Sequence, residues 1–322
     1  MKVLFVWPGL TGYMGDCWRE LAGRDGIDLK LVVDLSDKYF GGYFKPDDVL
    51  HDLNWRTDLS PLIPHPPSLG AWMPDVVFTV GWHNKVCRAA VEAFPNARKV
   101  CCFDMPWEWR LRKFAARFVL WRYLRRFDAA FVPGLVAAKY ARWLGFKECS
   151  IFKGLFSTDT TRSKSHNGGG GFLFLGREVP EKGIDVLRKA YGIYKANGGK
   201  WELHVVSNAT PSDVANYYSE ADCFVLPSRW EPWGVVLAEA AAAMLPIICT
   251  DKCGARHEVV SGNGFVVKSG DAKALASAMH KIENLSVDER LAMGAKGKAL
   301  AQPYSCKAWA DRVIDICHQL AK

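Results

Sequence analysis

The sequence lacks any apolar run long enough to cross a membrane. No stretch approaches the roughly 18 consecutive apolar residues that a membrane-spanning helix needs. The opening segment Met1–Pro8 has neither a long apolar core nor a cleavage site of small residues, so we expect a first buried strand rather than a signal peptide. With 49% hydrophobic residues, the composition is typical of a soluble globular protein with a real core.

Metal-binding cysteine patterns are also absent. Cys249 and Cys253 form a lone C-x3-C, and the other cysteines are scattered, mostly inside apolar runs. Free cysteines that pack as small apolar residues are typical of a reducing compartment. We therefore expect a cytoplasmic protein with no metal site and no cofactor.

Acidic residues are missing from one segment, residues 109–127. This segment lies in the first half of the chain, which carries most of the net charge of +8. A solvated helix face explains such a segment, but so does attraction to an anionic membrane surface or a phosphate-bearing acceptor. We expect no nucleic-acid partner, because no binding motif accompanies the charge. The basic residues are Arg110, Arg112, Lys113, Arg117, Arg122, Arg125 and Arg126.

The length of 322 residues predicts two domains, and the first half has the pattern of a doubly wound α/β domain. A strand at Val3–Trp7 is followed by glycines, a helix over Asp16–Gly23, and a second strand, Ile27–Asp34, that ends in an acid. The glycines Gly9, Gly12 and Gly15 are spaced G-x2-G-x2-G, which differs from the G-x-G-x2-G of dinucleotide-binding domains. An NAD-dependent dehydrogenase that uses this turn and Asp34 is one alternative.

Polar side chains follow two further predicted strands of the first half. His83 comes after Asp75–Gly81, and Asp104 comes after Lys99–Phe103. Open α/β sheets bind their ligands at the carboxyl ends of the strands, so both residues are site candidates. Residues 36–72 are rich in glycine, proline and aromatics with little periodicity, which favours a functional loop.

The second half begins after a polar, glycine-rich segment, Thr158–Gly171, that we interpret as a linker. A strand over Phe172–Leu175 leads into a glycine turn and a helix that ends near Ala196. Arg177 and Lys182 stand in that turn. Two cations beside glycine and a helix start predict an anion-binding cradle.

A strand–loop–helix–strand unit over Ala221–Val260 holds two carboxylates, Glu231 in the loop and Glu239 in the helix. Gly234 ends the loop, and the backbone N–H groups of Val235 and Val236 begin the helix. A helix start after glycine suits a phosphate or diphosphate, and a carboxylate on each side suits paired sugar hydroxyls. Two solvated glutamates near a helix start are the alternative.

Three groups of residues in the second half resemble glycosyltransferase family 4, whose members have the GT-B fold. The likeness covers residues 172–305 well and the first half only in outline. The resemblance implies an α/β protein of two Rossmann-like doubly wound domains facing a cleft. The groups are Gly176-Arg177…Glu181-Lys182-Gly183, Pro227-Ser228…Glu231-Pro232-Trp233-Gly234…Glu239-Ala240, and Gly254…Glu258.

The domain boundaries that we expect also rest on this resemblance. Residues 1–157 form the acceptor-side domain, 158–171 the linker and 172–304 the nucleotide-sugar-binding domain. Residues 305–322 form a helix that crosses back to the first domain.

The resemblance also implies an activity. Family members are retaining enzymes that move a sugar from a nucleotide sugar to an acceptor without a catalytic metal. For this chain we expect a UDP- or GDP-sugar as donor and a saccharide or lipid-linked acceptor, in cell-surface polysaccharide or glycolipid biosynthesis. We expect the protein in the cytoplasm, with peripheral contact at the inner face of the membrane through residues 109–127.

The roles of individual residues carry over from the matched motifs. Arg177 and Lys182 match the pair that neutralises the donor diphosphate, Glu231 the acid that binds donor-sugar hydroxyls, and Glu239 the acid that holds the ribose. Asp104 stands where many members have a histidine. The remaining donor-side candidates are Gly12, Ser228, Gly234, Val235 and Val236, and the remaining acceptor-side candidates are His83, Trp107 and Arg110.

Two alternatives share the fold with this expectation. One is a nucleotide-sugar hydrolase or epimerase, and the other is a non-catalytic GT-B scaffold that binds a partner. The intact set of Arg177, Lys182, Glu231 and Glu239 argues against the scaffold.

Overall fold

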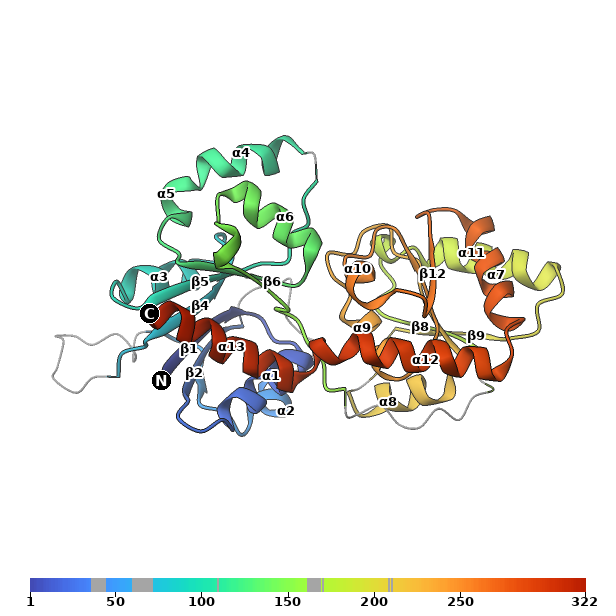
Figure 1. The fold of residues 1–322 in the computed structure, drawn as a ribbon, viewed down its shortest axis with the longest axis horizontal. Coiled ribbons are helices and arrows are strands. Elements are labelled where there is room, and N and C mark those ends of the chain that lie inside the picture. The colour runs from blue at the N-terminus through green and yellow to red at the C-terminus, as the bar shows by residue number, and fades with distance from the viewer. Residues whose placement is uncertain are drawn as a thin grey trace. The chain divides into compact units, whose positions relative to one another are not determined.

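The computed structural model describes residues 1–35, 45–59, 72–108, 110–160, 169, 171–207, 209 and 211–322. These residues form two compact units (Figure 1). The first unit contains Met1–Ser157 together with Cys306–Lys322, and the second contains Thr158–Ser305. Each unit is built around a parallel sheet, so the expected pair of Rossmann-like α/β domains is confirmed.

The sheet of the first unit has the strand order β3-β2-β1-β4-β5-β6-β7, and every neighbouring pair is parallel. The chain runs outward from β1 in one direction and then from β4 in the other. The order therefore reverses between β1 and β4, which are paired side by side. The strands are β1 (Lys2–Pro8), β2 (Asp28–Asp34), β3 (Trp55–Arg56), β4 (Val76–Val80), β5 (Arg98–Cys102), β6 (Ala129–Val132) and β7 (Ile151–Lys153).

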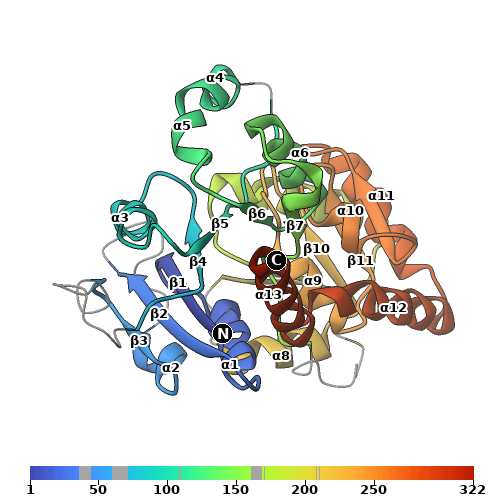
Figure 2. The ribbon, with the colours of Figure 1, turned by 60° about the vertical axis from the view of Figure 1, so that its left-hand side comes forward.

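Helices cover both faces of this sheet. Successive side chains of a strand point to opposite faces, and those of the central strands are buried on both. Phe5 lies in the cluster that includes α1 (Gly12–Ala22) and α13 (Cys306–Ala321), which lie side by side (Figure 2). Leu4 and Val6 lie in the opposite cluster, with α3 (Lys85–Ala93). The other helices of this unit are α2 (Pro46–Leu50), α4 (Leu111–Val119), α5 (Trp121–Leu124), α6 (Leu135–Leu144) and the 3-10 turn η2 (Glu148–Ser150).

The sheet of the second unit has the order β12-β11-β10-β8-β9, again with parallel neighbours. Its order reverses between β8 and β10. The strands are β8 (Phe172–Leu175), β9 (Leu203–Val206), β10 (Cys223–Leu226), β11 (Ile247–Thr250) and β12 (Gly264–Val267). The helices are η3 (Pro180–Lys182), α7 (Ile184–Ala196), α8 (Pro211–Glu220), α9 (Val235–Ala242), α10 (Arg256–Val259), α11 (Ala272–Glu283), α12 (Val287–Ala301) and η4 (Gln302–Tyr304).

The glycine turn after β1 differs from the expectation. Helix α1 begins at Gly12 rather than at Asp16, so Gly15 lies inside the helix. A Cβ atom on Gly15 would stand 2.4 Å from Cγ1 of Val49, at the end of α2. Close packing of α1 on α2 therefore explains Gly15, and a phosphate-binding turn is not needed for it.

The long segment that we expected to be irregular contains α2 and β3. Their shortness explains why periodicity did not reveal them. Residues 36–44 and 60–71 of that segment lie outside the described residues, as do 161–168 and 170 of the expected linker. The basic segment contains two helices, α4 and α5, which are separated at Leu120.

The cysteines are all free, and all except Cys149 are buried, which confirms their expected role as small core residues. Within the described ranges, no helix is long and apolar enough to cross a membrane. The same residues contain no group of His, Cys, Asp and Glu that could hold a metal ion.

Helix α13 anchors the first core through Trp309. Its indole is fully buried, its Nε1 donates to the carbonyl of Leu155 at 2.8 Å, and its ring lies 5.6 Å from the ring of Phe5. We predict that Trp309→Ala lowers the free energy of unfolding by about 3–5 kcal/mol. Urea denaturation followed by circular dichroism measures this. Trp121→Ala is the matched control, because removal of an indole that is 48% exposed should cost less, about 1–2 kcal/mol. An equal decrease in the free energy of unfolding in both variants would contradict the anchoring role of Trp309.

Candidate functional site

The second sheet brings two loops together at its carboxyl edge. The Gly176–Gly183 loop follows β8, and the Pro227–Gly234 loop follows β10, the strand beside it. This is the point where the strand order reverses, and open α/β sheets bind ligands at such switch points. The topology therefore places both sequence motifs of the second half on one edge.

Hydrogen bonds join these two loops directly. The backbone N–H of Arg229 donates to the carbonyl of Glu181 at 2.7 Å, and its guanidinium donates to both carboxylate oxygens of Asp185 at 2.6 and 2.5 Å. Gly183 has φ +68°, and a Cβ atom there would stand 2.4 Å from the carbonyl oxygen of Pro227. The close approach of the loops requires glycine at this position, which explains the glycine that follows Lys182.

Lys182 and Glu231 form an ion pair between the two loops. Lys182 Nζ donates to Glu231 Oε2, and Ser228 Oγ donates to the same oxygen at 3.4 Å. The side chains are only 17% and 12% exposed, so both charges are largely removed from water. Among the described residues, both hydrogen bonds to the Glu231 carboxylate end at Oε2. Oε1 can therefore accept a hydrogen bond from a ligand hydroxyl.

Helix α9 starts beside this pair. Its N-cap Gly234 has φ +96°, and a Cβ atom on Gly234 would stand 3.0 Å from Cγ of Glu231. The first turn of α9 carries no acidic residue and no side-chain cap. The N–H groups of Val235 and Val236 have no acceptor within the helix, so they are available to an anion.

Glu239 is held by two hydroxyl groups. Tyr218 donates to Oε2 at 2.9 Å, and Thr158 donates to Oε1 at 3.3 Å. Burial and the neighbouring Glu239 carboxylate raise the pKa of Tyr218 well above its usual value, so its hydroxyl keeps its proton and remains a donor. Tyr218 and Thr158 were not predicted as site residues. No sequence signal could have found Tyr218, because it lies on α8 with no motif around it.

Arg177 stands in the same loop as Lys182 but is exposed. Among the described residues it has no carboxylate within ion-pair distance. The structure therefore brings together Lys182, Ser228, Glu231 and Gly234, and it leaves Arg177 on the rim of the loop.

The first sheet gathers a second set of candidates at its own carboxyl edge. Gly12, His83 and Asp104 follow β1, β4 and β5, three adjacent parallel strands. Gly12 and His83 flank the switch point of this sheet. His83 is exposed and Asp104 is half-buried.

Asp34, which the dehydrogenase alternative would use, has a structural partner. Its Oδ2 accepts from Nδ2 of Asn84 at 2.7 Å, and Asn84 is also the N-cap of α3, where its Oδ1 accepts from the N–H of Cys87. The acid at the end of β2 thus positions the start of α3, which gives Asp34 a structural role that needs no dinucleotide.

Trp107 and Arg110, the other two acceptor-side candidates, already have partners within the first unit. The Trp107 ring packs 4.9 Å from Trp143 and 5.8 Å from Tyr140, in an aromatic cluster between the chain before α4 and α6. Arg110 is 70% exposed, and its Nε pairs with Glu108 at 3.1 Å. Packing explains Trp107 without a ligand.

The match to a known protein family lies in the second unit. The family model "Glycosyl transferases group 1" matches residues 197–300. A crystal structure of a glycosyltransferase from Rickettsia africae superposes with a TM-score of 0.73 at 14% identity and covers 100% of this chain and 98% of that one. The fold is GT-B. The structure of Anabaena HepE in complex with UDP and glucose has the same GT-B arrangement, with a TM-score of 0.69 at 12% identity and coverage of 99% and 100%.

Curated relatives match over a shorter stretch. The capsular polysaccharide biosynthesis glycosyltransferase CapM of Staphylococcus aureus is 32% identical over 143 residues, which is 37% of this chain and 37% of CapM. The putative teichuronic acid biosynthesis glycosyltransferase TuaC of Bacillus subtilis is 33% identical over 35% of this chain and 32% of TuaC. The chain thus spans about a third of the length of these relatives.

We predict strong energetic coupling between Lys182 and Glu231. Removal of one partner leaves the other charge uncompensated in a poorly solvated place, so the double variant Lys182→Met/Glu231→Gln should lose less stability than the two single changes added together. Urea unfolding of the four proteins should give a coupling energy of about 1–3 kcal/mol.

The exposed pair Arg188–Glu178 provides the matched control. Its side chains are 62% and 41% exposed, so water screens the charges and the coupling should stay within about 0.2–1 kcal/mol. A coupling for Lys182–Glu231 no larger than this control would contradict the description of the pair.

Proposed function

We propose that this GT-B protein is a retaining, metal-independent glycosyltransferase of family 4. It moves a sugar, of the hexose type, from a nucleoside-diphosphate sugar to a saccharide or lipid-linked acceptor in cell-surface polysaccharide or glycolipid biosynthesis. The observation that carries the proposal is the Lys182–Glu231 pair at the start of α9. A cation, a carboxylate oxygen with no hydrogen-bond partner among the described residues and a helix N-terminus within one pair of loops suit a sugar attached to a diphosphate.

The donor diphosphate binds at the start of α9 in this proposal. Departure of a nucleoside diphosphate builds negative charge on its oxygens as the bond to the anomeric carbon breaks. The N–H groups of Val235 and Val236, the Lys182 ammonium and the Arg177 guanidinium stabilise that charge, which is the task that Mg²⁺ performs in other enzymes. Lys182 has donors to spare, because an ammonium carries three N–H bonds and Glu231 takes one of them.

Glu231 binds hydroxyls of the donor sugar through Oε1. Its Oε2 stays with Lys182 and Ser228, so the carboxylate keeps its orientation when the ligand enters.

Glu239 binds the ribose hydroxyls of the nucleotide. The Tyr218 and Thr158 hydroxyls orient its carboxylate, one at each oxygen. Tyr218 is therefore a positioning residue for the proposed ribose contact.

The first unit contributes the proposed acceptor chemistry. Asp104 takes the proton of the acceptor hydroxyl or orients the donor sugar, and Gly12 lets the donor approach the start of α1. His83 and Arg110 are proposed contacts of the acceptor, and Trp107 supports them through its packing. These roles come from the family resemblance and from the position of the residues after β1, β4 and β5.

The remaining proposals concern the donor, the domains and the location. HepE was crystallised with UDP, and a Corynebacterium glutamicum relative is described as GDP-mannose-dependent, so UDP- and GDP-sugars are the first donors to test. We assign the acceptor side to 1–157 and the donor side to 172–304. Free cysteines throughout favour work in the cytoplasm, with contact to an anionic membrane surface through residues 109–127.

We predict that one nucleoside diphosphate among UDP, GDP, ADP and dTDP raises the melting temperature, while NAD does not. With the corresponding nucleotide sugar as donor, Glu231→Gln should lower transfer about 10²–10³-fold, because one charge-assisted contact to the reacting sugar is lost. Nucleotide-induced stabilisation should persist, since Glu239 and α9 are unchanged. Release of the nucleoside diphosphate in the presence of acceptor measures transfer.

Glu220→Gln at the exposed end of α8 is the control and should transfer at the wild-type rate. Stabilisation by NAD alone would overturn the proposal. Nucleotide binding with donor hydrolysis but no transfer to any acceptor would favour the hydrolase alternative instead.

A further inference from the structure

Helix α4 exposes apolar side chains that a water-facing helix would not carry. Leu111 is 89% exposed, Phe118 61% and Val119 77%, and no residue of α4 is buried. Leu111, Phe114 and Phe118 recur at positions i, i+3 and i+7, so they share one side of the helix. Trp121 at the start of α5 is 48% exposed and extends this apolar face.

Four of the seven cations in residues 109–127 have no carboxylate partner among the described residues, whereas Arg110 and Lys113 pair with Glu108 and Arg126 pairs with Glu92. Among the described residues, none of Arg112, Arg117, Arg122 and Arg125 has an acid within ion-pair distance. Instead, the guanidinium of Arg117 lies 5.5 Å from the ring of Trp143 and donates to the Trp143 carbonyl at 3.1 Å, and that of Arg125 lies 5.5 Å from the ring of Trp121. Aromatic rings orient these two charges but do not neutralise them.

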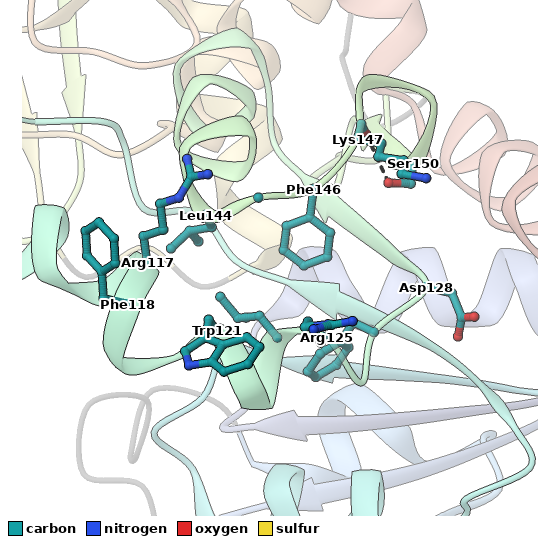
Figure 3. A pocket seen from close by; sticks show the side chains of 12 residues that line it. Arg117, Phe118, Trp121, Arg125, Asp128, Leu144, Phe146, Lys147 and Ser150 are labelled. Carbon is teal, nitrogen blue, oxygen red and sulfur yellow. Dashed lines mark hydrogen bonds between the residues drawn. The ribbon is translucent and has the colours of Figure 1, made fainter.

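A groove of about 700 Å³ opens beside this face, between α4–α5 and the end of α6 (Figure 3). Its apolar lining includes Phe118, Trp121 and Phe146, and its cations are Arg117, Arg125 and Lys147. The only acid that lines it among the described residues is Asp128. That carboxylate already pairs with Arg98 at 3.0 Å and accepts from the N–H of Lys99 at 2.8 Å, so it does not cancel the positive charge.

We propose that α4, α5 and this groove form a binding site for anionic membrane lipids. The apolar side chains enter the boundary of the acyl chains, and Arg117, Arg125 and Lys147 bind lipid phosphate. Trp121 takes the interfacial position that tryptophan favours. Charge complementarity identifies the occupant, because residues 110–127 contain basic and apolar side chains and no acid. This inference rests on the membrane contact in the proposed function and deepens it by naming the ligand and the residues that bind it. Lipid binding needs no transfer reaction, so the lipid site and the donor site can fail separately.

Vesicle flotation tests the site with the full chain. Binding to vesicles of phosphatidylcholine with one third phosphatidylglycerol should exceed binding to pure phosphatidylcholine at least tenfold, and salt should weaken it. Arg117→Gln/Arg125→Gln should lower the partition coefficient roughly 10- to 30-fold, because each basic residue near an anionic surface contributes about fivefold. Phe118→Ser/Trp121→Ser should lower it roughly 10- to 100-fold.

Matched controls come from the second unit. Val287→Ser/Leu291→Ser removes exposed apolar side chains of α12, which are 61% and 45% exposed, and Arg188→Gln/Lys189→Gln removes charges of α7. Both controls should bind vesicles as the wild type does. The melting temperature of each variant reveals a folding defect. The shift of that temperature with nucleotide reveals loss of the proposed donor site, so both can be told apart from loss of lipid binding.

Three results would overturn the lipid site, two of them from the vesicle experiment. One is equal binding to the neutral and the anionic vesicles. The other is equal loss in the groove variants and their controls, which would return the segment to a solvated basic face. Tighter binding of single-stranded DNA than of anionic vesicles, measured by fluorescence anisotropy, would assign the surface to nucleic acid instead.

Discussion

Strands β8 and β10 are paired side by side although a strand and two helices separate them in the chain. The candidate donor site depends on this pairing. Parallel strands that pair in one sheet end at the same edge, so the loops that follow them meet there. The backbone bond from Arg229 to Glu181 then fixes the distance between the loops. Lys182 and Glu231 become partners only through this arrangement, because neither loop alone holds both charges.

The same constraint acts in the first unit. Pairing of β1 with β4 and of β4 with β5 collects Gly12, His83 and Asp104 on one edge of the first sheet. Asp34, at the end of β2, accepts a hydrogen bond from Asn84 at the start of α3. Each unit therefore presents a small set of polar groups at the reversal of its strand order.

The two positively charged regions of the molecule differ in how their charges are held. Lys182 is largely buried and pairs with Glu231, so its ammonium group is held at one place between the two loops. The cations of α4 and α5 face solvent and lie beside aromatic rings and exposed apolar side chains. A directed charge suits one diphosphate, whereas a broad basic and apolar face suits a surface. The proposed donor site and the proposed lipid site therefore differ in whether a carboxylate lies beside the cation.

Sequence alone determined the elements around the donor motifs. Apolar runs bounded by glycine and proline predicted β8, β11 and the start of α9, because strong signals such as Gly234 and Pro246 separate these elements. The end of α9 at Ala242 comes earlier than Pro246 indicates. Short elements such as α2 and β3 were not predicted, because a segment of five residues or fewer shows no hydrophobic periodicity. Tertiary structure alone decided that Tyr218 orients Glu239, that Gly15 serves helix packing and that Lys182 pairs with Glu231. These contacts join segments far apart in the chain, and residue spacing carries no information about which distant side chains a fold will bring within hydrogen-bond distance.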